Sequence, residues 1–204
     1  MDQRTDAWFA ARCGRVTASR IADVMARTKS GYGASRATYL AQLVSERLTG
    51  EVAPSFSSPA MEWGTEKEPE ARAAYSAKTC EIVEETGFHK HPTLEAGASP
   101  DGLVRANGGG VVEIKCPNSS TMIEYLRTRQ IPHKYILQMQ FQMLCTGRGW
   151  CDFVAYDPRL GERLQLLIIR VERDPALIAE IEAEVTQFLK ELDQTVSELQ
   201  EMEV

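Results

Sequence analysis

Hydrophobic positions recur with helical spacing through the first eighty residues of the chain. Residues 17–25 begin with Thr-Ala-Ser, which can cap a short helix, and apolar side chains follow. Residues 36–49 repeat apolar positions three and four apart, and Gly50 comes next, as at many helix ends. Residues 60–77 predict a third helix. The pattern therefore indicates that residues 1–78 are mainly helical.

The pattern changes after Cys80, where short runs rich in β-forming residues alternate with Gly, Pro and Asn. Three such runs cover residues 81–88, 98–104 and 111–115. A glycine-rich turn at residues 107–110 can lead into the third run, because glycine adopts positive φ angles at little cost. We expect these runs to form an antiparallel meander.

The rest of the chain alternates between the two patterns. Helical spacing covers residues 119–128 and 133–144, strand-like runs cover residues 150–156 and 163–171, and a final helix starts near Asp174. This order of elements predicts an α/β fold with a central mixed β-sheet flanked by helices.

The length of 204 residues suits one domain. We expect that domain to cover residues 1–173, with its helices in residues 1–78 and its sheet and further helices in residues 80–173. Residues 174–204 are then an acidic amphipathic helix, which is either part of the same domain or an interaction surface.

The formal net charge of −6 is unevenly distributed. Residues 174–204 contribute −8, so the remainder carries +2. Residues 1–50 alone hold eight Lys or Arg against four acids, and this end is the expected contact for a phosphate backbone.

The composition also limits the location and chemistry of the protein. No apolar run is long enough to cross a membrane and the first thirty positions carry scattered charges, so we expect a cytoplasmic protein without a membrane partner. The five cysteines are odd in number and far apart, which indicates reduced thiols. His89, His91 and His133 are too scattered for a zinc site, and we assign them no catalytic role.

Charged side chains interrupt one strongly apolar strand. Between Val111 and Cys116, Glu113 and Lys115 alternate with apolar residues, so both point to one face of the strand. Asp101 lies twelve residues before Glu113, in a tight Ser-Pro-Asp-Gly turn. Unpaired charges on a buried strand cost on the order of several kcal/mol, so a partner must compensate them.

A divalent cation held by Asp101 and Glu113 would provide that compensation. Mg²⁺ prefers oxygen ligands and completes its shell with water and phosphate, so the carbonyl oxygen of Ile114 is a further candidate ligand; Mn²⁺ can substitute. With the Lys115 ammonium nearby, such a centre can hydrolyse phosphodiesters. The alternative is a plain ion pair of Glu113 and Lys115, with Asp101 as a turn residue.

These residues resemble a known nuclease signature. Asp101 followed by Glu113, Ile114 and Lys115 is similar to the PD-(D/E)xK signature. The longer strings SPDGL and EIKCP resemble the phage lambda exonuclease and YqaJ-like viral recombinase family. Further matches lie in residues 10–19, at Trp63-Gly64, in residues 138–140 and in residues 156–159, so the resemblance covers roughly residues 6–173. It implies a restriction-endonuclease-like core.

The resemblance implies a Mg²⁺-dependent, processive 5′-to-3′ exonuclease that acts on double-stranded DNA ends and leaves 3′ overhangs for phage-type recombination by single-strand annealing. It also implies a homotrimeric ring around the DNA, a single-strand annealing protein as partner, and a phage or prophage protein in the bacterial cytoplasm. In a ring only the channel lining must be positive, which reconciles the acidic net charge with DNA binding. Two alternatives stay open: a related nuclease of other polarity or endonucleolytic habit, and a non-catalytic DNA-binding recombination scaffold.

The resemblance adds Glu68 and Gln140 to the expected catalytic residues. Glu68 lies where the family has a helical acidic residue that contacts metal or water; the alternative is a solvated glutamate beside Glu66 and Glu70. A glutamine on the helix after the catalytic strand can hold the attacking water or a phosphate oxygen. Gln138 and Gln140 cannot share one helix face, and we choose Gln140.

Arg12, Ser19 and Lys29 correspond to the family's pocket for the terminal 5′ phosphate. Charge-assisted hydrogen bonds and a helix N-terminus favour an anion in such a pocket. The chain departs from the family by having Lys29 where arginine is expected and Thr121 where another basic residue is expected. We therefore expect weaker or rearranged phosphate contacts.

The last helix carries one apolar stripe. Its members alternate at steps of three and four, namely Ile178, Ile181, Val185, Phe188, Leu192, Val196 and Leu199. The stripe packs either on its own domain or on a neighbouring subunit or the annealing protein.

Overall fold

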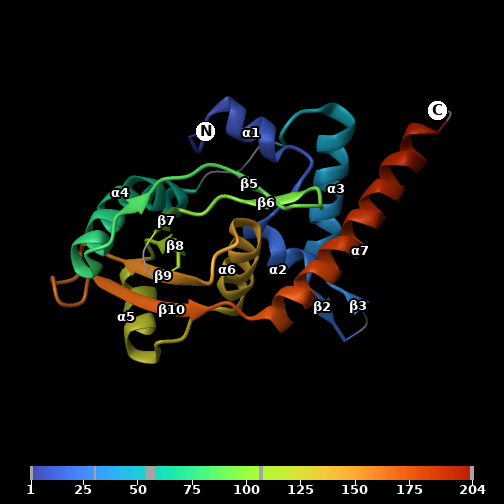
Figure 1. Ribbon diagram of the computed structural model, residues 1–204. Helices are drawn as coiled ribbons and strands as arrows, with labels where there is room; N and C mark the ends of the chain where they lie inside the picture. The colour runs from blue at the N-terminus through green and yellow to red at the C-terminus, as the bar shows by residue number, and fades with distance from the viewer. Residues whose placement is uncertain (1, 30, 54–57, 106–107, 203–204) are drawn as a thin grey trace.

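The computed structural model describes residues 2–29, 31–53, 58–105 and 108–202 (Figure 1). Its N-terminal part is helical, as predicted, and contains α1 (Asp6–Arg12), β1 (Val16–Thr17), the 3₁₀ helix η1 (Ala18–Arg20), α2 (Ile21–Val24), the hairpin β2 (Arg27–Thr28) and β3 (Gly31–Tyr32), α3 (Ala34–Thr49) and α4 (Pro59–Thr79). The sequence pattern does not predict α1, because this helix of seven residues buries no side chain and so has no apolar stripe.

A mixed sheet forms the centre of the molecule. Among the described residues it has five strands in the order β10, β9, β8, β7, β4, with bounds β4 (Val83–Glu84), β7 (Gly102–Val104), β8 (Gly110–Lys115), β9 (Trp150–Tyr156) and β10 (Leu166–Glu172). Strands β8 and β9 run parallel, and the other neighbours are antiparallel. The predicted α/β class with a mixed sheet flanked by helices is confirmed.

The strands between residues 81 and 115 do not form one meander, so this part of the prediction is wrong. Strands β5 (His89–Lys90) and β6 (Ala96–Ala98) join β1 in a separate sheet of order β1, β6, β5. Pro100 lies between β6 and β7, and because proline has no N–H for a sheet ladder, the chain leaves one sheet before it enters the other. The predicted turn begins at Asn107, which lies outside the described residues.

Helices cover both faces of the central sheet. Helix α4 packs on one face, while α5 (Ser119–Thr128) and α6 (His133–Thr146) pack on the other. Alternate side chains of β8 point to opposite faces of the sheet. Val112 and Ile114 pack with Tyr75 of α4, and Val111 packs with Met139 of α6. Strand β8 is therefore buried from both sides, as its apolar sequence predicts.

Helix α6 lies between two hydrophobic cores. Met139 and Met143 enter the core against the sheet, whereas Leu137 and Phe141 enter a core shared with α2, α3 and α7. Figure 1 shows α6 between β9 and the helices α2 and α7. Packing from two sides fixes this helix relative to β8.

The stripe of α7 (Pro175–Gln200) packs on its own chain. Ile181, Phe188 and Leu192 are fully buried against α2, α3 and α6, whereas Leu199 near the end is 41% exposed. In Figure 1 the C-terminal end of α7 projects beyond the other elements. No helix in the described ranges combines the length and apolar character that a membrane span requires.

Helix α7 also neutralises a buried charge on α3. The Arg36 side chain is 5% exposed, donates to the Glu191 carboxylate and donates from Nε to the Val24 carbonyl at 3.2 Å. The hydrogen bond from Arg36 lowers the pKa of Glu191 below its ordinary value. A carboxyl whose pKa is lower in the folded state than in the unfolded state stabilises the fold at pH values above the unfolded-state pKa. This stabilisation is lost as the pH falls through the folded-state pKa.

We predict that Glu191→Gln lowers the free energy of unfolding by about 1–2 kcal/mol at neutral pH, because a buried guanidinium loses its counter-charge. The loss should shrink as the pH falls through the lowered pKa of Glu191, because the parent carboxyl then becomes protonated too. Denaturant unfolding across this range measures the effect, with Glu180→Gln at an exposed position of the same helix as control. The ion pair is contradicted if the variant is equally destabilised at acidic and neutral pH.

Candidate active site

Asp101 is fixed by the backbone of β8. Strand β7 begins at Gly102, which pairs with Val112 of β8. The pairing between these two strands therefore ends before Ile114 of β8. The Oδ2 atom of Asp101 accepts a hydrogen bond from the Ile114 N–H at 2.7 Å and thus continues the ladder by one step. Because the N–H and C=O of one strand residue point to the same side, the Ile114 carbonyl also faces the Asp101 side.

Glu113 is a buried carboxylate with several donors. It is 1% exposed, and Lys115 on the same face of β8 donates to its Oε1. The amides of Gln138 and Gln142 on α6 donate to Oε1 and Oε2 at 2.6 and 2.5 Å. These donors fix the orientation of the carboxylate and offset the cost of its burial.

Lys115 stays charged in this environment. Burial disfavours its ammonium form, but the Glu113 and Asp101 carboxylates outweigh that effect and raise the pKa of Lys115 above its ordinary value. The Nζ atom also lies 5.1 Å from the ring centroid of Tyr135. A protonated lysine at this position can stabilise negative charge on a bound anion.

Glu68 of α4 lies near Asp101, because Arg72 donates both to the Glu68 carboxylate and to the Asp101 carbonyl. Its carboxylate accepts from Arg72 at 2.6 Å and from Arg4 at 3.0 Å. Burial, followed by the Glu113 charge, raises the pKa of Asp101 well above its ordinary value, and Glu68 adds to this rise. The structure thus brings Asp101, Glu113, Lys115 and Glu68 into one acidic cluster with one ammonium.

The cluster opens into a cleft of about 1090 Å³. Asp101, Ile114 and Lys115 contribute to its lining, together with Glu68. Further lining residues come from the segment before α1, from α4, α5 and α6, and from the turn after β9. They include the cations Arg4, Lys134 and Arg159 and the aromatic side chains Trp63 and Tyr135. An acidic centre surrounded by cations suits a phosphate ester bound through a divalent ion.

The donor set fits a hard divalent cation. Asp101, Glu113 and the Ile114 carbonyl all offer oxygen, the ligand type that Mg²⁺ prefers. Within the part of the chain that the structure describes, no three His, Cys, Asp or Glu residues are gathered closely enough to enclose an ion by themselves. Mg²⁺ is usually bound by one or two carboxylates and keeps several water ligands, which is the arrangement that this donor set allows.

Gln140 does not point to this cluster, which corrects the choice made from the sequence. Its Nε2 donates to the Glu172 carbonyl, and its Oε1 accepts from the Asp174 N–H, both at 2.9 Å. Gln138 takes the place expected of Gln140, and Gln142 one helical turn later joins it. The spacing of four residues between these two glutamines is the signal that could have identified them.

One of the three predicted phosphate ligands, Lys29, lies apart from Arg12. Arg12 donates to the Ser99 hydroxyl at 3.2 Å, and its guanidinium lies 4.1 Å from the Trp8 ring centroid. Burial lowers the pKa of Arg12. Ser19 is exposed next to Thr17. Lys29 is exposed in the β2–β3 turn, and Figure 1 shows this hairpin far from α1, so Lys29 does not share a pocket with Arg12.

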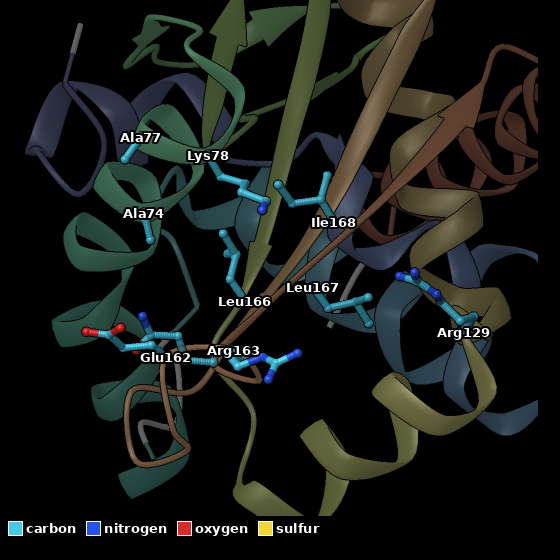
Figure 2. Close-up of a pocket in the computed structure, with 10 residues that line it drawn as sticks. Ala74, Ala77, Lys78, Arg129, Glu162, Arg163, Leu166, Leu167 and Ile168 are labelled. Carbon is cyan, nitrogen blue, oxygen red and sulfur yellow. The ribbon is translucent and has the colours of Figure 1, made fainter.

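A second concave surface of about 630 Å³ lies along the edge strand β10 (Figure 2). Figure 2 shows Lys78 on α4, Arg163 before β10 and Arg129 after α5 around the apolar side chains of β10. Glu162 is the carboxylate among its described lining residues. Its described lining residues offer no pair of acids for a metal, whereas the cleft at Asp101 also holds Glu68.

Comparison with known proteins places this cleft in a family context. The model of the YqaJ-like viral recombinase domain matches residues 7–149. The chain belongs to the YqaJ-like viral recombinase family. The matched region includes Asp101, Glu113 and Lys115, and the resemblance inferred from the sequence motifs is confirmed.

Solved structures give the same relationship. The alkaline exonuclease LHK-Exo from Laribacter hongkongensis is 54% identical, with a TM-score of 0.88 and 96% of each chain covered. Its complex with dAMP matches at 55% identity with the same TM-score and coverage. A phage-related exonuclease from Haemophilus somnus shares the fold at 16% identity, with a TM-score of 0.70 over 91% of this chain and 96% of that one. No curated protein matches the chain. These relationships support a nuclease of the lambda exonuclease type.

We predict that Gln138→Ala and Gln140→Ala separate activity from stability in this YqaJ-like protein. Gln138→Ala removes a donor to Glu113, the partner of Lys115, and should reduce nuclease activity more than stability. Gln140→Ala leaves the Glu172 carbonyl and Asp174 N–H unpaired and should cost about 1–3 kcal/mol of stability instead. Denaturant unfolding and initial rates of DNA hydrolysis test both variants, and the reverse ranking would contradict the assignment.

Proposed function

We propose that this protein is a Mg²⁺-dependent exonuclease that digests one strand of duplex DNA processively from its 5′ end and leaves 3′ overhangs for recombination. The observation that carries the proposal is that Asp101 and Lys115 line one open cleft, while the buried Glu113 carboxylate accepts from Lys115 directly behind it. The family match and the 54% identity to an alkaline exonuclease support it.

Asp101, Glu113 and the Ile114 carbonyl are the residues that would hold Mg²⁺, and Mn²⁺ could substitute. When bound, such an ion supplies Lewis acidity to water and to the phosphate oxygens. Glu68 lies close enough to raise the pKa of Asp101, so it is suited to orient a water on the opposite side of this centre.

Lys115 acts on the phosphate through its charge. Because its pKa is raised, the ammonium remains protonated and can stabilise the negative charge that develops on the phosphorus oxygens. Gln138 and Gln142 keep the Glu113 carboxylate oriented while Lys115 turns toward the substrate. Because the glutamines orient Glu113 and only the Lys115 side chain turns, neither β8 nor α6 has to move far, and the site is preorganised.

Arg12 and Ser19 are the proposed contacts for the terminal 5′ phosphate. The Arg12 guanidinium reaches Ser99, two residues before Asp101, and thus lies close to the catalytic cluster. The related Laribacter enzyme has been solved with dAMP, a nucleoside monophosphate, which fits stepwise release of single nucleotides. Lys29 is too far from this pocket to join it within one chain.

The proposed assembly is a homotrimeric ring that encloses the duplex, in the cytoplasm of a bacterial host, with a single-strand annealing protein as partner. The charge distribution supports a ring, since residues 174–204 hold an excess of acids and the rest of the chain is slightly basic. The projecting end of α7, with Leu199 41% exposed, offers a surface for either contact.

A labelled-end assay tests polarity and mode of attack together. Linear duplex labelled at the 5′ end should release labelled mononucleotides from the start of a Mg²⁺-dependent reaction, whereas duplex labelled at the 3′ end should first become single-stranded. Closed circular duplex should remain intact. Nicking of the circle would favour an endonuclease, and unchanged DNA would favour a non-catalytic recombination scaffold.

We predict that Asp101→Asn and Lys115→Ala each reduce the rate of hydrolysis by about 1000-fold or more, because one removes a metal ligand and the other the ammonium. The asparagine can still accept from the Ile114 N–H, so the fold should persist. Initial rates measure the loss, with Asp193→Asn on the exposed surface of α7 as control. Undiminished activity in either variant contradicts the proposed catalytic set.

We predict that Arg12→Ala reduces the preference for 5′-phosphorylated over dephosphorylated ends by about 10-fold, because a charge-assisted contact to the phosphate is lost. Competition between the two kinds of end in one reaction measures the preference. Arg15→Ala, whose parent side chain pairs with Glu95, is the matched control. An unchanged preference in Arg12→Ala would remove this residue from the phosphate pocket.

A further inference from the structure

The segment before α1 is anchored beside the catalytic cluster. The Gln3 amide donates to the Thr86 carbonyl at 2.9 Å and to the Pro100 carbonyl at 2.7 Å, directly before Asp101. On the other side, the Thr5 hydroxyl caps α1 by accepting from the Trp8 N–H. The residue between these anchors is held in place from both sides.

That residue, Arg4, has an unusual backbone. Its φ angle is +65°, in the left-handed region that non-glycine residues rarely adopt and that costs about 1–2 kcal/mol. The conformation directs a long cationic side chain toward the cleft, which Arg4 helps to line. The strained backbone of Arg4 therefore goes with a fixed position of its positive charge at the cleft.

Arg4 is not required to neutralise Glu68. Arg72 already donates to the same carboxylate at the shorter distance of 2.6 Å, and its side chain is only 13% exposed. Arg4 donates at 3.0 Å to the other oxygen, and its side chain is 52% exposed. Arg72 is therefore the structural partner of Glu68, and Arg4 is a partner that solvent and ligands can reach.

The cleft places Arg4 among groups that suit a polyanion. Lys134 from α6 and Arg159 from the turn after β9 line the same cleft, so cations from three separate parts of the chain surround the acidic centre. A phosphate entering this cleft would compete with Glu68 for Arg4. Arginine binds phosphate through paired, charge-assisted hydrogen bonds, so the exchange replaces one anionic partner with another.

We propose that Arg4 is a DNA-binding residue that moves from Glu68 to a backbone phosphate when substrate enters the cleft. The exchange frees one Glu68 oxygen to face the reacting phosphate, while Arg72 keeps the carboxylate in place. This inference rests on the proposed nuclease function, because it takes the ligand of the cleft to be DNA.

Equilibrium binding of 5′-phosphorylated duplex without divalent ions tests the proposal apart from catalysis. Arg4→Asn is the informative variant, because asparagine tolerates the left-handed backbone. We expect its Kd for DNA to rise by about 5- to 20-fold. The slope of log Kd against log salt concentration should fall by about one, which corresponds to the loss of one phosphate contact. Arg4→Lys should keep the salt dependence with a smaller loss of affinity. The control is Arg105→Asn, whose parent side chain is 80% exposed and pairs with Glu84.

The exchange itself is tested in a Glu68→Gln background. With no carboxylate to leave, Arg4 should contribute more to DNA binding, so Arg4→Asn should raise the Kd by a larger factor there than in the parent. In steady-state hydrolysis Arg4→Asn should raise KM more than it lowers kcat. An unchanged Kd, an equal effect in both backgrounds, or a fall in kcat alone would overturn the inference. If the parent binds DNA but does not hydrolyse it, the nuclease proposal fails while the binding result still decides the role of Arg4.

Discussion

The burial of Glu113 is the constraint on which the rest of the site depends. A carboxylate that is 1% exposed on a central strand is tolerable only if donors reach both of its oxygens. Lys115 supplies one donor from the same face of β8, and Gln138 and Gln142 supply two more from α6. The polar side chains on the face of α6 toward β8 and the raised pKa of Lys115 both go with this one carboxylate.

The remaining groups are placed by the backbone and not by side-chain packing. Asp101 accepts the N–H of Ile114 because β7 starts too late to do so, and the same geometry aims the Ile114 carbonyl at the cleft. The side-chain period of two then decides which charges face α6. A slip of β8 by one residue would turn Glu113 toward Tyr75 and Val112 toward the glutamines, so the site depends on the strand register.

Local sequence predicted the parts of the site that a single element determines. The alternation of Glu113 and Lys115 on one apolar strand indicated their common face, and Asp101 stood out in its turn. The choice between Gln138 and Gln140 was wrong because α6 is apolar on both sides, with Leu137 facing one core and Met139 the other, so the pattern cannot show which side faces β8.

The split of residues 81–115 between two sheets and the distance of Lys29 from Arg12 depend on tertiary contacts that no local pattern contains. The same holds for Arg4, which approaches Glu68 across 64 positions of sequence and carries no motif of its own.

The double packing of α6 has a consequence for engineering. Because α6 packs between two cores, a substitution that changes side-chain volume on either side would shift the helix and move Gln138 and Gln142. Attempts to raise thermal tolerance should therefore leave this helix alone and work on the outer surfaces of α3 and α7, where added helix propensity or charge pairs would not disturb the carboxylate that α6 supports.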